Sequence, residues 1–154
     1  MPEAVRTTVR FEAILFLAGL FITIGTLGPW EVIPPVERNP LSSWHGNVAF
    51  VGGIITMVGA LISYEFFRTR SIESRRPLMD AGLGALGAVL GIVSSVTFLL
   101  DLSPGASPGW ALYLTLAFSL IALFAAYGLY RDESPRIPKG LSATHLVPVE
   151  KSQR

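Results

Sequence analysis

Five ionisable side chains lie in or next to long apolar stretches of this 154-residue chain and are the first candidates for chemistry. They are Glu12, Glu65, Asp80, Asp101 and His45. A charged group in an apolar membrane segment is costly and is retained mainly for function, and histidine titrates near neutral pH and readily binds metals. Because the chain has no cysteine, disulfides, zinc–thiolate sites and iron–sulfur clusters are excluded. Thiol chemistry is excluded for the same reason.

Glu12 and Asp80 each open an apolar stretch, close to an arginine-rich part of the chain. Two interpretations stay open. The carboxylates either stabilise the amino termini of their helices and pair with arginine, or form an acidic vestibule that accepts a cation or a proton. For Glu65 we expect an ordinary ion pair with Arg68, three residues further along the same helix.

A second group of candidates lies where the apolar stretches meet the other set of connections. The group contains Trp30, Glu31, Trp44, His45, Asp101 and Trp110. A histidine beside carboxylates could bind a metal ion or respond to pH, but one histidine is a poor basis for a metal site. We therefore predict no metal and no cofactor, and expect hydrogen bonds and aromatic packing that order the proline-rich segment at 29–45.

Four apolar stretches must position these candidates, and they cover residues 11–28, 46–67, 81–100 and 110–130. Each has roughly 20 residues, the number with which a helix rising about 1.5 Å per residue crosses a hydrocarbon core. Only 15% of the chain is charged, against about a quarter in soluble domains. The sequence predicts an all-α fold, an antiparallel four-helix transmembrane bundle within residues 1–130. A disordered cytoplasmic tail follows at 131–154, because that segment is polar and contains proline.

Arginine and lysine set the orientation of this bundle. All of them except Arg38 fall in the N-terminal segment, in the connection between the second and third stretches, or in the tail. Basic residues concentrate on the cytoplasmic side, so we predict a multi-pass protein of the cell membrane with both termini cytoplasmic. As an alternative, the first stretch is a secretory signal peptide cut after Gly28, which leaves the other stretches oriented as before. His45 and His145 then lie on opposite sides, which excludes a haem held by both.

Small residues gather on one face of each stretch at 3.6 residues per turn. They include Gly53, Gly84, Gly87, Gly91 and Ser95. Lipid gives helices no hydrophobic reason to associate, whereas small residues let backbones approach closely. We therefore predict that these faces pack inside the bundle and that bulky residues face lipid. Gly87 and Gly91 form a GxxxG pair, for which we expect packing within one chain, with a homodimer seam as the alternative.

Three short motifs lie at the ends of the apolar stretches. Pro29-Trp30 ends the first stretch, Trp44-His45-Gly46 opens the second, and residues 108–114, Pro-Gly-Trp-Ala-Leu-Tyr-Leu, open the fourth. In this arrangement the membrane part of the chain resembles uncharacterised prokaryotic four-helix (tetraspan) integral membrane proteins. The resemblance implies the tetraspan fold and carries no activity.

No catalytic motif is present, and a net charge near zero gives no electrostatic reason for binding nucleic acid. The first functional hypothesis is a non-enzymatic accessory or scaffold subunit of a larger membrane assembly. Its partners would be the lipid bilayer and either other membrane subunits or further copies of itself. The alternative is a small oligomeric transporter or channel with Glu12 and Asp80 in a cytoplasmic vestibule. A membrane enzyme that acts on lipid ranks last, because no base and nucleophile can be placed at one depth.

Overall fold

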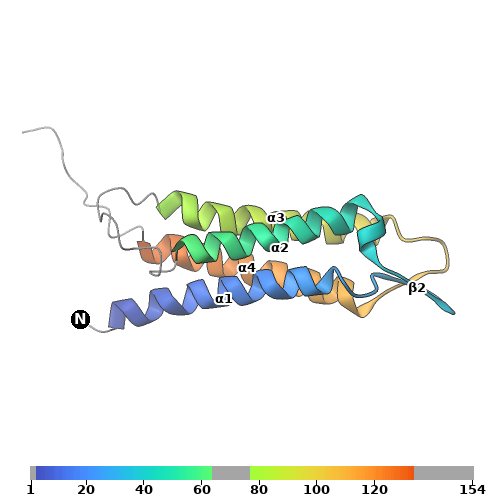
Figure 1. Cartoon of the computed structure of the whole chain (residues 1–154), viewed down its shortest axis with the longest axis horizontal. Coiled ribbons are helices and arrows are strands. Elements are labelled where there is room, and N and C mark those ends of the chain that lie inside the picture. The colour runs from blue at the N-terminus through green and yellow to red at the C-terminus, as the bar shows by residue number, and fades with distance from the viewer. Residues whose placement is uncertain (1–2, 64–76, 134–154) are drawn as a thin grey trace, which may run out of the picture.

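A computed structural model describes the backbone of residues 3–63 and 77–133, and the side chains of residues 11–63 and 81–131 (Figure 1). The described chain is mostly helical, as the sequence predicts. Its long helices are α1 (Glu3–Gly25), α2 (Trp44–Ser63), α3 (Pro77–Leu100) and α4 (Trp110–Glu133). Glu65, His145, the side chain of Asp80 and the predicted tail beyond residue 133 lie outside the described part.

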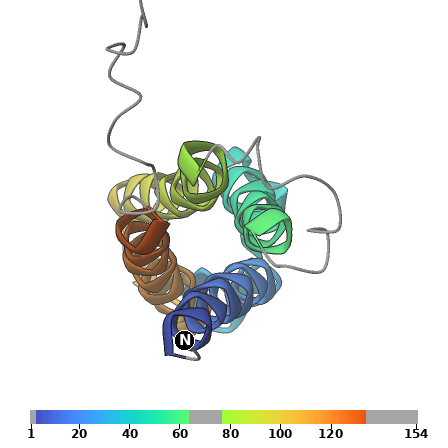
Figure 2. The same ribbon diagram turned by 90° about the vertical axis from the view of Figure 1, so that its left-hand side faces the viewer.

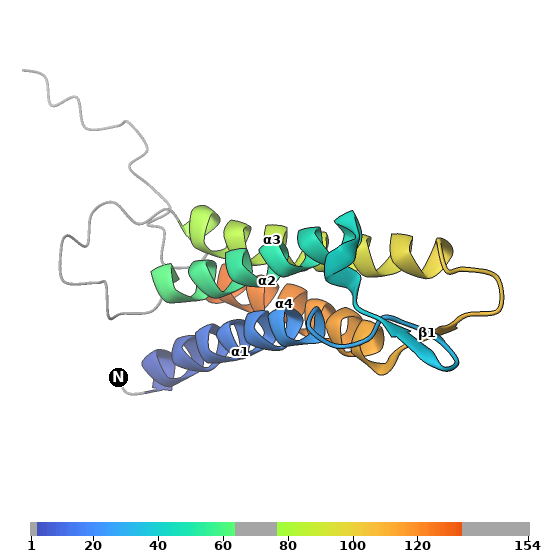
Figure 3. The same ribbon diagram turned by 45° about the vertical axis from the view of Figure 1, so that its right-hand side comes forward.

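Each long helix packs mainly against two neighbours, in the cyclic order α1, α2, α3, α4 and back to α1. Seen along its length, the molecule is a ring of four helices (Figure 2). The last turns of α1 and α3 and the first turns of α2 and α4 meet at one end, where three short strands also lie (Figure 3). We call this the sheet end of the molecule.

Three of the described helices contain an apolar segment that is long enough, by length and composition, to cross a membrane. The segments are Trp44–Ser63, Ala81–Leu100 and Trp110–Arg131. The apolar part of α1, Phe11–Gly25, is shorter than these. The prediction of helices is confirmed in all four stretches, and the prediction of membrane-spanning length is confirmed in three.

Helix α1 ends at Gly25, three residues before the predicted end of the first stretch at residue 28. The indole Nε1–H of Trp30 donates a hydrogen bond of 3.0 Å to the carbonyl oxygen of Gly25. The last carbonyls of a helix have no partner inside it, so this bond satisfies one of them while the chain turns towards the sheet. Hydropathy alone could not place the boundary, because the residues up to Leu27 are as apolar as the helix.

The small residues predicted to pack inside the bundle are buried in α2 and α3. Gly53, Gly84, Gly87, Gly91 and Ser95 all lie inside the ring. A Cβ atom built on Gly52 would lie 2.7 Å from the carbonyl oxygen of Gly87, and one on Gly19 would lie 2.8 Å from that of Gly53. These distances are shorter than real side chains tolerate, so α2 approaches α1 and α3 at backbone distance. Both glycines of the GxxxG pair face neighbouring helices of the same chain. Gly87 lies against α2, and Gly91 lies against Ser119 of α4.

Several buried hydroxyl groups bond to their own helices rather than across them, whereas the buried hydroxyls of Ser94 and Ser95 have no hydrogen-bond partner among the described residues. Thr56 donates to the carbonyl oxygen of Gly52 at 2.9 Å, and Thr115 donates to that of Ala111 at 2.9 Å. Ser119 donates to the carbonyl oxygen of Thr115 in the same way, at 2.8 Å. Because each oxygen lies four residues earlier, these groups are satisfied locally, and the helices associate by close packing.

The sheet end carries an antiparallel sheet in the order β2-β1-β3. Its strands are β1 (Glu31–Ile33), β2 (Val36–Arg38) and β3 (Ser107–Pro108). A short 3-10 helix, η1 (Pro40–Ser42), follows β2. The sequence predicts no strand at this end, because strands of two or three residues are too short to produce a detectable alternation of polar and apolar residues. The pairing of Val32 with Ser107 joins the connection before α2 to the connection before α4.

Candidate functional site

Trp30 lies at the centre of the sheet end. Its side chain is fully buried, and its ring packs edge-on against Phe98 of α3 with ring centroids 5.2 Å apart. The ring of His45, from the first turn of α2, meets the same phenylalanine edge-on at 5.5 Å. Two residues of the predicted cluster are therefore brought together through Phe98. Phe98 could not be singled out from the sequence, because it is one apolar residue among many in α3.

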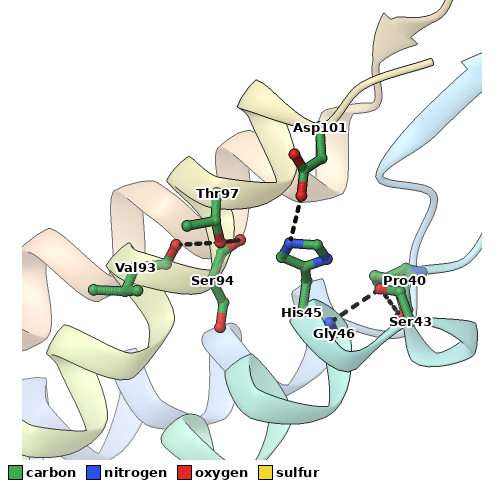
Figure 4. Close-up of polar contacts among 8 residues, drawn as sticks. All are labelled: Pro40, Ser43, His45, Gly46, Val93, Ser94, Thr97 and Asp101. Carbon is green, nitrogen blue, oxygen red and sulfur yellow. Dashed lines mark hydrogen bonds and ion pairs between the residues drawn. The ribbon is translucent and has the colours of Figure 1, made fainter.

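His45 joins the first turn of α2 to the end of α3. Its imidazole is buried, its Nε2 lies 3.3 Å from Oδ2 of Asp101, and the Asp101 side chain is exposed (Figure 4). The indole of Trp44 stacks on the imidazole at 3.9 Å and lies on the outside of the molecule. Within the described residues no three potential ligands of the types His, Cys, Asp or Glu gather to hold a metal ion. The contact between His45 and Asp101 joins the first turn of α2 to the residue that follows α3.

Glu31 is the second buried polar group of this end. The backbone N–H of Ser103 donates to its Oε1 at 3.0 Å, and Nη1 of Arg38 lies 3.6 Å from its Oε2. Hydrogen bonding by Ser103 is the largest cause that lowers the pKa of Glu31 below its ordinary value of 4.5, burial opposes it, and Arg38 adds to it. A carboxylate whose pKa is lowered on folding contributes to stability at pH values above its unfolded-state pKa. This contribution is lost as the pH falls through the folded-state pKa. At neutral pH Glu31 is therefore ionised, and its contacts link β1 to β2 and to the connection that follows α3.

Asn39 is a structural residue that our reading of the sequence missed. Its Nδ2–H donates to the carbonyl oxygen of Leu27 at 2.9 Å, and its Oδ1 accepts from the N–H of Leu41 at 2.8 Å. The side chain thus caps η1 and ties it to the turn after α1. A signal was available, because asparagine followed by proline is typical of a helix N-cap and its first residue.

The predicted cluster of six is only partly assembled. Trp30, Glu31 and His45 are buried and Asp101 contacts His45, whereas Trp44 and Trp110 are 57% and 61% exposed. Trp44 still stacks on the buried imidazole of His45 from the outside, and Asp101 contacts His45 with an exposed side chain. Among the described residues, two pairs of ionisable groups contact each other at this end, Glu31 with Arg38 and His45 with Asp101.

Glu12 lies well away from this end, in the first half of α1. Its side chain is 3% exposed, which agrees with the inward direction expected from the helix face. It borders a small apolar space of about 210 Å³ between α1 and α2, together with Ala13, Phe16, Ala60 and Leu61. Because the Asp80 side chain is outside the described part, the structure does not place the two predicted vestibule carboxylates relative to each other.

The fold therefore defines a mostly helical protein, three of whose described helices are long and apolar enough to cross a membrane, with a small sheet at one end. Comparison with known protein families, with curated proteins and with solved structures gave no match.

Proposed function

We propose that this chain is an integral membrane protein, an antiparallel four-helix bundle with both termini in the cytoplasm. We further propose that it acts as a non-enzymatic accessory or scaffold subunit of a larger membrane assembly. The observation that carries this is the apolar outer surface of all four helices. Large exposed side chains include Leu17 and Phe21 of α1, Val58 and Leu61 of α2, Val89 and Val93 of α3, and Leu120 and Phe124 of α4. A water-soluble bundle would carry charged residues on these faces.

Aromatic residues on α4 support a transmembrane position. Trp110 and Tyr113 are exposed near the start of this helix, and Tyr127 and Tyr130 are exposed near its end. At about 1.5 Å per residue, Trp110 and Tyr130 are about 30 Å apart along the axis. That separation matches the hydrocarbon thickness of a bilayer, and tryptophan and tyrosine are enriched at its two boundaries.

Helix α1 is proposed to cross with the others although its apolar part is short. The complete helix has 23 residues and is therefore about 35 Å long. It packs between α2 and α4, and its exposed residues Leu17, Phe21 and Ile24 continue the apolar surface of its neighbours. A helix held in this position shares the depth of the helices beside it.

The orientation can be tested directly because the chain has no cysteine. We expect Glu37→Cys, at an exposed position of β2, to react with a membrane-impermeant maleimide in intact cells. Ser152→Cys should react only after the membrane is permeabilised, because the basic tail is proposed to be cytoplasmic. Leu86→Cys, on the apolar surface, is the unreactive control. Labelling of Ser152→Cys in intact cells would show that the orientation is wrong.

The role as a subunit is supported by how the polar groups are used. Inside the bundle the hydroxyls of Thr56, Thr115 and Ser119 bond to the backbone of their own helices. At the sheet end Glu31 pairs with Arg38, and His45 pairs with Asp101. Such contacts stabilise the structure, and the groups that make them are not available for chemistry. After purification in a mild detergent we expect a partner in a fixed molar ratio, which a harsh detergent should remove. Recovery of the chain as a lone monomer under mild conditions would contradict the proposal.

A second candidate function, a small oligomeric transporter or channel, is favoured by Glu12. A carboxylate that is 3% exposed in an apolar helix interface is costly and is often part of a proton or cation path. The test is flux into proteoliposomes. Glu12→Gln and Asp80→Asn should abolish a flux that Glu37→Gln, at the sheet end, leaves intact. An equal flux in all variants would remove this candidate.

A further inference from the structure

A groove of about 600 Å³ runs along the outer surface between α3 and α4, in the half of the molecule away from the sheet end. Helix α3 contributes only small residues to it, and α4 contributes a wall of larger ones. Its main lining residues are Ala81, Gly82, Ala85, Phe124, Tyr127 and Tyr130. A Cβ atom built on Gly82 would meet nothing within 4 Å, so this glycine is not required by packing inside the chain. The groove faces the medium that surrounds the bundle.

The wall of the groove changes in character along α4. Phe124, which is 68% exposed, lies one turn before Tyr127, which is 61% exposed. Arg131 is also exposed and lies one further turn along. Residues at this spacing share a helix face. Along this face the apolar part of the groove is followed by phenolic hydroxyls and then by a guanidinium group. A lipid with a long acyl chain and an anionic head group has complementary parts in the same order, an apolar part followed by a polar and charged part.

We propose that this groove binds one anionic phospholipid, with an acyl chain between α3 and α4 and the head-group phosphate at Arg131. The inference rests on the proposed transmembrane position, in which Tyr127, Tyr130 and Arg131 reach the boundary of the cytoplasmic leaflet. Arginine reaches towards the head groups from such positions, and its fork of donors matches a phosphate. Anionic lipids are enriched in that leaflet and attract basic side chains there.

A second copy of the chain fits this groove less well. Close helix association in lipid needs small residues on both surfaces, whereas Phe124 and Tyr127 project from one wall. A symmetric dimer places the same patch of both subunits together, so it would bring the two Arg131 side chains towards each other. Helix α4 continues from Arg131 to Asp132 and Glu133, so it is the exposed guanidinium of Arg131, and not the net charge of this end, that favours an anionic head group as the occupant.

The test is native mass spectrometry of the delipidated full-length protein in detergent, titrated with phosphatidylglycerol or phosphatidylcholine of identical acyl chains. We expect one tight phosphatidylglycerol per chain. Arg131→Gln should lower the affinity for phosphatidylglycerol about five-fold, the effect of one basic residue at a lipid surface, and leave phosphatidylcholine unchanged. Arg38→Gln, with the same charge change at the sheet end, is the matched control and should change neither affinity.

Filling the groove tests where the acyl chain lies. Gly82→Leu and Ala85→Leu should lower the affinity for both lipids about ten-fold or more, whereas Val58→Leu, on the outer face of α2, should not. An unchanged preference in Arg131→Gln would overturn the head-group assignment, and unchanged affinity in both groove variants would overturn the site. A dimer that excludes lipid would do the same.

Alkaline carbonate extraction of the wild-type membranes separates this inference from the proposed function. A chain that stays in the membrane but binds no lipid contradicts the lipid site alone. A chain that is released contradicts the transmembrane position, and the site with it.

Discussion

Replacing Trp30 with alanine is expected to destabilise the fold by about 3–5 kcal/mol, the usual cost of truncating a fully buried tryptophan. Trp30 has no exposed surface, packs on Phe98 and supplies the hydrogen bond to the last turn of α1. Its loss would leave a cavity where α1, α3 and the sheet meet, and a carbonyl oxygen without its partner. The measurement is equilibrium unfolding in detergent, followed by circular dichroism.

Two further variants divide this effect into packing and hydrogen bonding. Trp30→Phe keeps an aromatic ring but removes the indole donor, so we expect an intermediate loss that includes about 1 kcal/mol for the bond to Gly25. Trp44→Ala removes a tryptophan that is 57% exposed, and its effect on stability should stay within about 1 kcal/mol. Equal losses in Trp30→Ala and Trp44→Ala would show that Trp30 does not organise the sheet end.

The second large effect is expected at Gly87, where even one added methyl group has no space. A Cβ atom at this position would collide with Oγ1 of Thr56 and with the carbonyl oxygen of Gly52. The carbonyl belongs to the backbone of α2, so relief requires the two helices to separate. We expect Gly87→Ala to cost about 1–3 kcal/mol, the range for overpacking a tight contact, and Gly87→Leu to prevent the native packing of α2 on α3.

Gly82 provides the matched control on the same helix. Its side-chain position is open, so Gly82→Ala should be neutral or slightly stabilising, because alanine is the better helix former by about 1 kcal/mol in water. If Gly87→Ala and Gly82→Ala have the same free energy of unfolding, the close approach of α2 and α3 is not a source of stability. A loss in Gly87→Ala that disappears at high protein concentration would point instead to the homodimer seam.

The positions of the helices and the faces that they bury could largely be predicted from hydropathy and periodicity along the sequence. Helix α3 ends at Leu100 and helix α4 begins at Trp110, as expected from where the apolar stretches stop and start. The inward direction of Gly84, Gly87 and Glu12 follows from 3.6 residues per turn. Periodicity and hydropathy are local properties, because a helix makes its backbone hydrogen bonds within one segment and turns each side chain by a constant angle.

The sheet end depends on contacts between residues far apart in the sequence. Glu31 bonds to Ser103, 72 positions away, and the strand containing Val32 pairs with Ser107. The importance of Phe98 likewise arises from Trp30 and His45, which meet it from two other segments. No local pattern encodes such pairs, because strand partners and ring contacts are chosen only when packed helices bring their ends together. The helices thus follow from the order of residues along the chain, whereas the arrangement of the sheet end follows from the packing of the whole.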